Sequence, residues 1–259
     1  QHTVLGDNGE VIYVALGQTG AGRGLTYTTT DMLATTGGND SITLDDGDSV
    51  VIGGMGADTI ASANGTDTIL GDNGFIQRDI EGNNFALIAT KSQNTTTGPQ
   101  FVTDQGGDDI ITGLTGDKRA FGGDGNDRIT FTTGDHVAFG DNGMITYVAM
   151  DLAGEGRARL YETTDDLTGT GGIDVITLGD GNNTILGGMR GDTIASANGT
   201  DTILGDNGFI QRDIEGNNFA LIATKSQNTT TGPQFVTDQG GDDIITGLTG
   251  DKRAFGGDG

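Results

Sequence analysis

The chain has 259 residues and a formal net charge of −24, with 37 acidic and 13 basic residues. This balance excludes a nucleic-acid binder that relies on a basic surface. Glycine accounts for 49 residues, only 33% of the residues are hydrophobic, and cysteine and tryptophan are absent. Disulfides and thiolate metal sites are therefore excluded, and the apolar runs, such as 85–89, are too short to span a membrane. Backbone hydrogen bonds or oxygen-bound cations must stabilise the fold.

The chain repeats itself with a period of 134 residues. Residues 58–125 recur without one difference as residues 192–259. Around this block the copies differ in letters but keep their pattern, as in the Gly-Asp-Asn-Gly motifs that begin at Gly6 and Gly140. We therefore expect one continuous structure over 1–259, in which 6–139 form a first repeat and 140–259 a second, truncated one.

A period of nine residues lies beneath the long repeat. Residues 53–61 read GGMGADTIA and residues 122–130 read GGDGNDRIT, with aspartate sixth and an apolar residue eighth. Nonamers in this frame begin at residues 35, 44, 53, 62 and 71, and again at 104, 113, 122, 131 and 140. The looser segments 26–34 and 95–103 are interpreted as degenerate sixth nonamers. Glycine permits the tight turn and the apolar stretch forms a short strand, so two nonamers predict one turn of a coil.

This glycine-rich nonapeptide resembles the RTX, or haemolysin-type, calcium-binding repeat. The resemblance extends over most of the chain. It implies an all-β fold, namely a parallel β-roll (a β-solenoid) of nonapeptide half-turns with β-hairpin insertions, and Ca²⁺ as the bound ion. It also implies a bacterial protein that leaves through a type I secretion channel and acts outside the cell or at its surface.

Alternate nonamers place their turns on opposite edges of the roll. On one edge the sixth position is aspartate in each regular turn: Asp40, Asp58, Asp109, Asp127, Asp174, Asp192 and Asp243. Calcium takes six to eight oxygen ligands, and two stacked turns offer two carboxylates together with turn carbonyls. We therefore expect calcium on this edge, with Gly53, Met55, Gly122 and Asp124 in the same turns. Arg190, which replaces a turn glycine, makes the second copy's site weaker.

The opposite edge has a poor series of sixth positions: Ser49, Asp67, Gln100, Lys118 and His136. Lys118 is expected to repel a cation there. Only Asp67 and its equivalent Asp201 keep a plausible calcium site on this edge. For any single aspartate the alternative is a solvated turn residue with local backbone hydrogen bonds.

Four segments that follow the Gly-Asp-Asn-Gly motifs predict β-hairpins: 10–25, 75–94, 144–159 and 209–228. Six nonamers, or three turns, are counted between successive hairpins. The hairpins should then leave one common edge, the one poor in calcium ligands, and stand about 14 Å apart at ~4.8 Å per turn. Because each carries apolar residues on both faces, we expect it to pack on the flank of the roll or on a neighbouring chain.

The favoured function is a structural, calcium-binding segment of a large secreted adhesin or extracellular fibre, which calcium makes rigid after secretion. Its expected partners are calcium ions and further copies of the chain, associated laterally or end to end. The alternative is a folding and secretion domain attached to a secreted enzyme or toxin. No catalytic motif is present in this chain, so it is not expected to be an enzyme. Ice or carbohydrate binding by a flat threonine face is disfavoured, because the threonines do not keep one register over successive nonamers.

Overall fold

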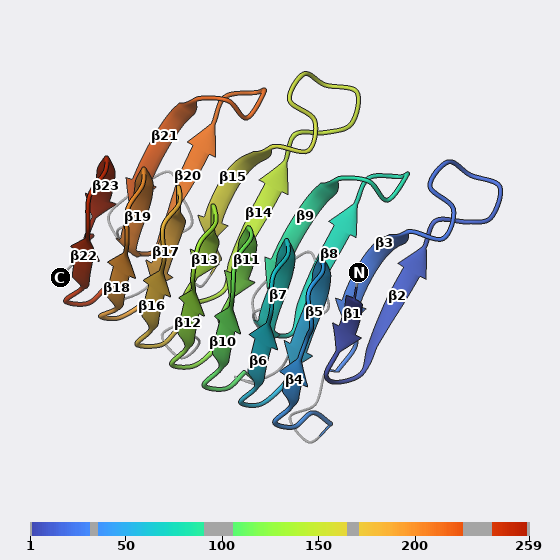
Figure 1. The fold of residues 1–259 in the computed structure, drawn as a ribbon, viewed down its shortest axis with the longest axis horizontal. Helices are drawn as coiled ribbons and strands as arrows, with labels where there is room; N and C mark the ends of the chain where they lie inside the picture. Colours follow the sequence, from blue (N-terminus) through green and yellow to red (C-terminus); the bar gives the residue numbers. More distant parts are fainter. Residues whose placement is uncertain (1, 32–35, 91–105, 165–170, 225–239, 258–259) are drawn as a thin grey trace, which may run out of the picture.

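The computed structural model describes residues 2–31, 36–90, 106–164, 171–224 and 240–257. The regular elements in these ranges are 23 β-strands, arranged in two parallel sheets and one antiparallel sheet. Within the same ranges there is no helix that is long and apolar enough to cross a membrane. The predicted all-β parallel roll is confirmed (Figure 1).

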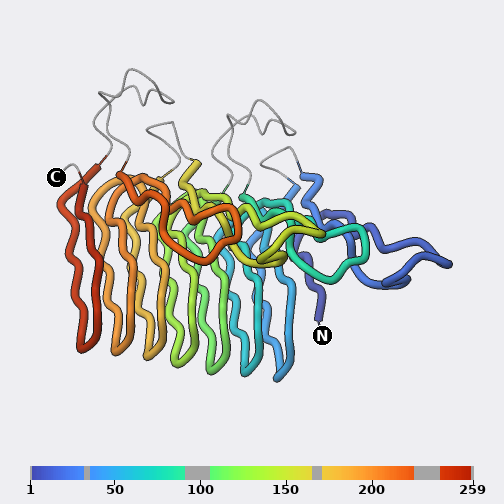
Figure 2. The backbone as a smooth tube through the Cα atoms, turned by 90° about the horizontal axis from the view of Figure 1, so that it is seen from above, coloured from blue at the N-terminus to red at the C-terminus, as the bar shows by residue number. Residues whose placement is uncertain are grey.

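One parallel sheet, here called the central sheet, contains eight strands stacked along the long axis of the molecule (Figure 2). In stacking order they are β1 (His2–Leu5), β5 (Ser49–Gly54), β7 (Asp67–Asp72), β11 (Lys118–Phe121), β13 (Val137–Phe139), β17 (Thr184–Gly188), β19 (Asp201–Asp206) and β23 (Lys252–Phe255). The other parallel sheet, the outer sheet, has seven shorter strands. They are β4 (Ser41–Thr43), β6 (Thr59–Ser62), β10 (Ile110–Gly113), β12 (Arg128–Phe131), β16 (Val175–Leu178), β18 (Thr193–Ser196) and β22 (Ile244–Gly247). One central strand and one outer strand make each turn of the roll.

The four predicted hairpins form the third sheet, here called the hairpin sheet. Its strands, in order, are β2 (Gly9–Tyr13), β3 (Gly24–Thr29), β8 (Gly74–Arg78), β9 (Phe85–Thr90), β14 (Gly143–Tyr147), β15 (Ala158–Thr163), β20 (Gly208–Arg212) and β21 (Phe219–Thr224). Neighbouring hairpins pair with each other, β3 with β8, β9 with β14 and β15 with β20. The antiparallel sheet therefore runs without a break across the junction of the two 134-residue copies.

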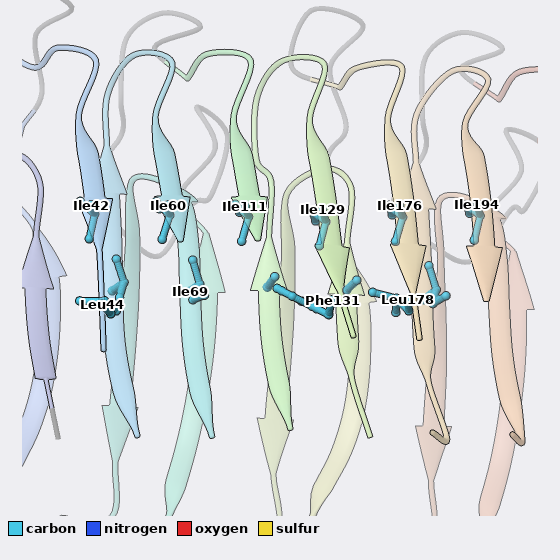
Figure 3. Packing of buried hydrophobic residues seen from close by; sticks show 14 of the residues in the cluster. Ile42, Leu44, Ile60, Ile69, Ile111, Ile129, Phe131, Ile176, Leu178 and Ile194 are labelled. Atoms are coloured by element: carbon cyan, nitrogen blue, oxygen red, sulfur yellow. The ribbon is translucent and has the colours of Figure 1, made fainter. Parts of the chain in front are cut away.

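Alternate side chains of the central sheet enter two separate hydrophobic cores. Val51 and Ile69 pack inside the roll, together with one isoleucine from each of six successive outer strands (Figure 3). Val50 and Leu70 point the other way and pack with Ile76 of the hairpin sheet. Since both faces of the central sheet are covered, β5 and β7 consist entirely of buried residues. The hairpins thus pack on the flank of the roll, the first of the two expected arrangements.

The spacing of the hairpins differs from the prediction. Only two central strands, β5 and β7, lie between the first and second hairpins, so two turns separate them and not three. The supposed nonamer 26–34 instead contributes to hairpin strand β3, and the segment 95–103 lies outside the described residues. The physical reason is the spacing between strands, which is ~4.8 Å in both sheets. Two turns of the roll add two strands to the central sheet, and one hairpin adds two strands to the hairpin sheet, so the two sheets grow by the same width. This match allows adjacent hairpins to hydrogen-bond to one another.

The hairpins do leave one common edge, but the predicted edge was wrong. Central strand β7 ends at Asp72 and hairpin strand β8 begins at Gly74. After the hairpin the chain returns to the same edge, where Gly106 pairs with Gly56 of the preceding turn before outer strand β10 starts. The Gly-Asp-Asn-Gly turn therefore opens directly into the hairpin, with no strand between them. This places the hairpins on the edge that carries the sixth-position aspartates.

The threonines of the outer sheet keep a register that the sequence interpretation missed. On its exposed face, Thr43, Ala61, Thr112, Thr130 and Thr177 are successive cross-strand partners. Register is kept because parallel pairing joins every second nonamer, whereas the prediction compared successive nonamers. The adjacent column contains Ile110 and Arg128 and is not threonine-bearing throughout.

Candidate metal centre

The two edges of the roll have different turn chemistry. The first edge comprises the turns that lead from the central sheet to the outer sheet, and the second edge comprises the turns that lead back. Each of the seven predicted aspartates ends a first-edge turn, immediately before an outer strand: Asp40, Asp58, Asp109, Asp127, Asp174, Asp192 and Asp243. The structure thus brings the whole predicted set onto one edge.

These aspartates form a continuous ladder of hydrogen bonds. The backbone N–H of each donates to Oδ1 of the next, at distances of 2.7 Å from Asp40 to Asp58, 2.6 Å from Asp58 to Asp109, 2.7 Å from Asp109 to Asp127, 2.7 Å from Asp127 to Asp174, 2.8 Å from Asp174 to Asp192 and 2.9 Å from Asp192 to Asp243. The parallel outer strands keep equivalent residues opposite each other, so the ladder crosses the hairpin insertions. From Asp58 to Asp243, one carboxylate oxygen of each ladder residue is thereby used to hold the preceding turn.

In six of the seven ladder aspartates the other carboxylate oxygen, Oδ2, lacks a hydrogen-bond donor among the described residues. It is buried and unpaired, among the described residues, in Asp40, Asp58, Asp109, Asp127, Asp192 and Asp243. A turn carbonyl lies beside it: a Cβ at Gly53 would overlap both Asp58 Oδ2 and Gly71 O, and a Cβ at Gly122 would overlap both Asp127 Oδ2 and Gly140 O. Glycine is required at these two predicted positions because the oxygens occupy that space. Converging oxygens without donors suit a hard cation.

The first-edge carboxylates do not form a metal site by themselves. Within the described ranges no cluster of three or more acidic or histidine side chains could hold a metal ion by itself. A cation on the first edge must therefore take many of its ligands from turn carbonyls. Calcium accepts carbonyl as well as carboxylate oxygens in flexible geometries, so the residues present fit this ion.

Burial makes the ionised form of these aspartates costly. Desolvation, reinforced by neighbouring aspartates, raises the pKa of Asp58 to about 7, of Asp109 to about 8 and of Asp192 to about 9. Desolvation and the charges of Asp174 and Asp109 also hold the pKa of Asp127 well above its ordinary value. A buried carboxylate of this kind is stabilised by a proton or by a cation.

The Gly-Asp-Asn-Gly turns add carboxylates that the sequence interpretation missed. Asp72 Oδ2 accepts the N–H of Asp124 at 2.5 Å, and Asp7 Oδ2 accepts that of Met55 at 2.6 Å. Desolvation, and after it the charges of neighbouring aspartates, raise the pKa of Asp72 well above its ordinary value. Asp72 Oδ1 is buried without a hydrogen-bond partner. The signal was an aspartate at the second position of all four Gly-Asp-Asn-Gly motifs. Through their amides, Met55 and Asp124 hold these carboxylates in place.

On the second edge a lysine occupies the place expected for a cation. Lys118 Nζ donates to Asp67 Oδ2 at 2.7 Å and to the carbonyls of Ala63, Gly65 and Thr115 at 2.9, 2.7 and 3.2 Å. The Lys118 and Asp67 side chains are 0% and 1% exposed. The prediction of calcium at Asp67 is therefore corrected: Lys118 does not merely repel a cation but replaces it.

The second copy repeats this arrangement. Lys252 Nζ donates to Asp201 Oδ2 at 2.5 Å and to the carbonyls of Ala197 and Gly199 at 2.6 and 3.2 Å. Asp201 therefore also leaves the set of proposed calcium ligands. Other sixth positions of this edge donate to turn carbonyls too, Ser49 Oγ to Gly47 and Asn183 Nδ2 to Gly179. Gln100, the remaining predicted position, lies outside the described residues.

Arg190 does not interrupt the first edge. Its φ is 69°, in the left-handed region that Gly56 occupies in the first copy with φ of 98°. Arg190 also pairs with Gly240 in the way that Gly56 pairs with Gly106. The Asp174 to Asp192 rung is therefore built like its first-copy counterpart, at the cost of an arginine in a backbone conformation that favours glycine.

The comparisons with known proteins agree with this geometry. The family model described as the RTX calcium-binding nonapeptide repeat (4 copies) matches residues 34–69, 104–135 and 161–194. No curated protein and no solved structure matches the chain. RTX nonapeptide repeats bind calcium, and the matched ranges contain Asp40, Asp58, Asp109, Asp127, Asp174 and Asp192 of the ladder. Over these ranges the chain therefore carries RTX calcium-binding nonapeptide repeats, and its fold is a parallel β-roll.

Proposed function

We propose that this chain is a structural segment of a secreted bacterial surface adhesin or extracellular fibre, that calcium bound along its first edge makes it rigid, and that it has no catalytic role. The observation that carries the proposal is the row of buried, donor-less Oδ2 atoms on the first edge. The proposed ligands are the six ladder aspartates with such an atom, the ladder residue Asp174, and the carbonyls of the adjoining turns.

Charge explains why folding should depend on the ion. At −24 the chain repels itself, and six of the ladder carboxylates lie in stacked turns and, among the described residues, form no ion pair with a side chain. Calcium supplies positive charge and coordination to these oxygens when it is bound. An ion that binds the folded state and not the unfolded chain stabilises folding by mass action. Inside a cell, where free calcium is scarce, the chain should stay unfolded.

The test is circular dichroism of the isolated chain, first with chelator, then with millimolar magnesium, then with millimolar calcium. We expect weak β signal in chelator and in magnesium, which demands tighter octahedral geometry, and strong β signal in calcium. Full β signal under chelation at neutral pH would overturn the proposal.

Two features support an adhesin or fibre over a segment attached to an enzyme or toxin. Residues 58–125 recur unchanged as 192–259, and both parallel sheets run from one copy into the next, with β12 paired to β16 and β13 to β17. Each further copy would lengthen the same roll, as expected for an extended structural protein. Sequencing the complete gene separates the two readings: many further copies indicate a fibre, and an adjoining catalytic domain indicates a secreted enzyme.

Self-association of the fibre remains part of the proposal. The inner face of the hairpins is taken up by the central sheet, so lateral association would use their outward face, where Leu87 of β9 is partly exposed. Sedimentation of the calcium-loaded chain tests this with a second copy of the chain as partner. A monomer at every concentration would remove lateral association and leave the structural function intact.

A further inference from the structure

A cavity of about 370 Å³ lies where the tips of two hairpins overhang the second edge. Its walls come from strands β11, β13 and β17 of the roll on one side and from hairpins β14–β15 and β20–β21 on the other. This volume is at the lower end of the range for pockets that bury a small molecule, about 300–1,000 Å³. None of the proposed calcium ligands lines it.

Three arginines line this cavity in a chain that carries few cations. They are Arg119 from the roll and Arg157 and Arg212 from the hairpins. Arg157 donates to Asn217 Oδ1, Arg119 lies over the ring of Phe85 and Arg212 over that of Phe219. No ion pair joins these three arginines to an acidic group in the described part of the chain.

Two of these guanidinium groups also have a buried nitrogen without a hydrogen-bond partner. Nη1 of Arg119 and Nε of Arg212 are buried without a hydrogen-bond partner among the described residues. Arg119 and Arg212 are half-buried, and a cationic N–H that is buried without a partner is costly. An anion in the cavity would remove this cost, and guanidinium binds carboxylates through two parallel hydrogen bonds.

The remaining wall is suited to hydroxyl groups. Tyr147 and Tyr161 contribute aromatic surface, and burial raises the pKa of Tyr147 to about 12 and also raises the pKa of Tyr161, so both keep the hydroxyl proton. Asp117 and Asp135 each use Oδ1 to accept a backbone amide, at 2.9 and 2.7 Å, and line the rim. These carboxylates would accept hydrogen bonds from a ligand and would repel a polyanion.

We propose that this cavity binds a carboxylate-bearing sugar, a hexuronate unit or its equivalent. The arginines would bind the carboxylate, the aspartates and Tyr hydroxyls would bind the ring hydroxyls, and the tyrosine rings would contact the apolar face of the sugar. A bare inorganic anion would leave most of the volume and the acidic rim unused. The proposal concerns a binding activity and does not depend on the adhesin assignment.

Both 134-residue copies are needed to build the cavity. Arg119 belongs to the first copy, whereas Arg157 and Arg212 belong to the second. Their sequence equivalents are Arg253, Arg23 and Arg78, which do not line this cavity. In a longer tandem array such a site would recur once in every 134 residues and give a multivalent surface.

This duplication supplies a matched control. Arg119 and Arg78 both lie over Phe85, and Arg212 and Arg253 both lie over Phe219. The variants Arg119→Gln/Arg212→Gln and Arg78→Gln/Arg253→Gln therefore lose the same charge and one cation–π contact each on Phe85 and Phe219; the first also loses the contact of Arg212 with Tyr161, a wall of the cavity, and the second loses the hydrogen bond from Arg78 to Asn83 O. Only the first variant alters the cavity.

The experiment is calorimetric titration of the calcium-folded chain with cellobiouronate and with neutral cellobiose. We expect one cellobiouronate per chain and at least tenfold weaker binding of cellobiose. Affinity for cellobiouronate should fall at least tenfold in Arg119→Gln/Arg212→Gln and stay within twofold of the parent in Arg78→Gln/Arg253→Gln. Failure of the folded parent chain to bind cellobiouronate, equal binding of cellobiose, or equal losses in both variants would overturn the proposal.

A third variant covers the case in which the arginine variants fold poorly. Asn182 lines the cavity, and its first-copy equivalent is Asp48, so Asn182→Asp places a residue that this turn already accepts. The added carboxylate should weaken cellobiouronate binding at least fivefold and leave the calcium-induced β signal unchanged. Unchanged affinity would count against the site. The β signal is recorded first in every arm, so a failure of calcium-dependent folding is seen separately.

Discussion

The first and second edges of this roll face the same problem and solve it differently. Both consist of glycine-rich turns whose sixth residue points at neighbouring oxygens. On the first edge that residue is aspartate, and its Oδ2 is unpaired in six described rungs, which suits an external cation or a proton. On the second edge Lys118 and Lys252 bring an ammonium group into a cage formed by a carboxylate and turn carbonyls. The calcium dependence that we propose therefore belongs to one edge and not to the nonapeptide roll as a whole.

The largest effect should come from removing first-edge carboxylates. Asp58→Ala/Asp127→Ala deletes two buried rungs, so we expect the calcium concentration for half-maximal folding to rise at least tenfold, or about 1.4 kcal/mol. The measurement is a calcium titration followed by circular dichroism.

The control for this variant is Asp46→Ala/Asp180→Ala on the second edge. Both residues are exposed and each accepts a backbone amide, at 3.1 and 3.0 Å. This pair should shift the calcium midpoint less than threefold. Equal shifts in the two double variants would show that the edges do not differ.

A second substitution should convert the second edge to the chemistry of the first. Lys118→Met keeps the bulk of the side chain but leaves Asp67 as a buried, unpaired carboxylate, a change that costs about 3–5 kcal/mol in other proteins. We expect a higher calcium midpoint for folding and, at saturation, one additional calcium ion per chain, measured by equilibrium dialysis.

The double variant Lys118→Met/Asp67→Asn tests whether the unpaired carboxylate of Asp67 causes both the loss of stability and the additional calcium binding. Without the carboxylate the cage should bind no additional calcium, and most of the lost stability should return. A stoichiometry for Lys118→Met equal to that of the parent chain would mean that the cage accepts only an ammonium group.

Acidity should substitute in part for calcium on the first edge. The folded-state pKa values of Asp58, Asp109 and Asp192, about 7, 8 and 9, lie above the ordinary value of 3.8. The folded chain then binds more protons than the unfolded chain, so this contribution to stability is complete below the unfolded pKa and is lost as pH rises through 7 to 9. In chelator, β signal and melting temperature should be higher at pH 5 than at pH 9.

The same protons compete with the ion, so the apparent calcium affinity should fall as pH decreases from 9 to 6. Asp79 contributes to stability with the opposite sign, because hydrogen bonds from nearby amides lower its pKa. Its contribution therefore changes only in more acidic solution, near and below the ordinary value of 3.8. A chelated chain that becomes more stable as pH rises from 5 to 9 would contradict the assignment of raised pKa values.

The nonapeptide period predicted the roll and the alignment of the sixth-position aspartates on one edge, because both follow from the repetition of one turn. The sixth-position aspartates came together as expected, since parallel pairing stacks each turn on its equivalent. The number of turns between hairpins could not be derived this way. That number follows from the width of the hairpin sheet, and the apolar residues Val50 and Leu70, which form its support, look like ordinary strand residues in the sequence.

The role of Lys118 could not be predicted from a single nonamer either. Lysine at a ligand position indicates repulsion when one nonamer is considered alone. The carbonyls that it binds include those of Ala63 and Gly65, more than 50 residues earlier in the chain. Which turn lies next to it depends on the hairpin insertion, and so does the identity of its partner Asp67.

The equal widths of two turns and one hairpin have a genetic consequence. One 134-residue copy contributes four central strands and two hairpins, so it adds ~19 Å of roll at ~4.8 Å per turn. Residues 58–125 and 192–259 are identical, which gives recombination an extended region of homology. A crossover there deletes or adds a whole copy, and every sheet on both sides of the junction keeps its register. The number of copies can therefore vary between lineages without any change in the fold, in the ladder of the first edge or in the lysine cages of the second.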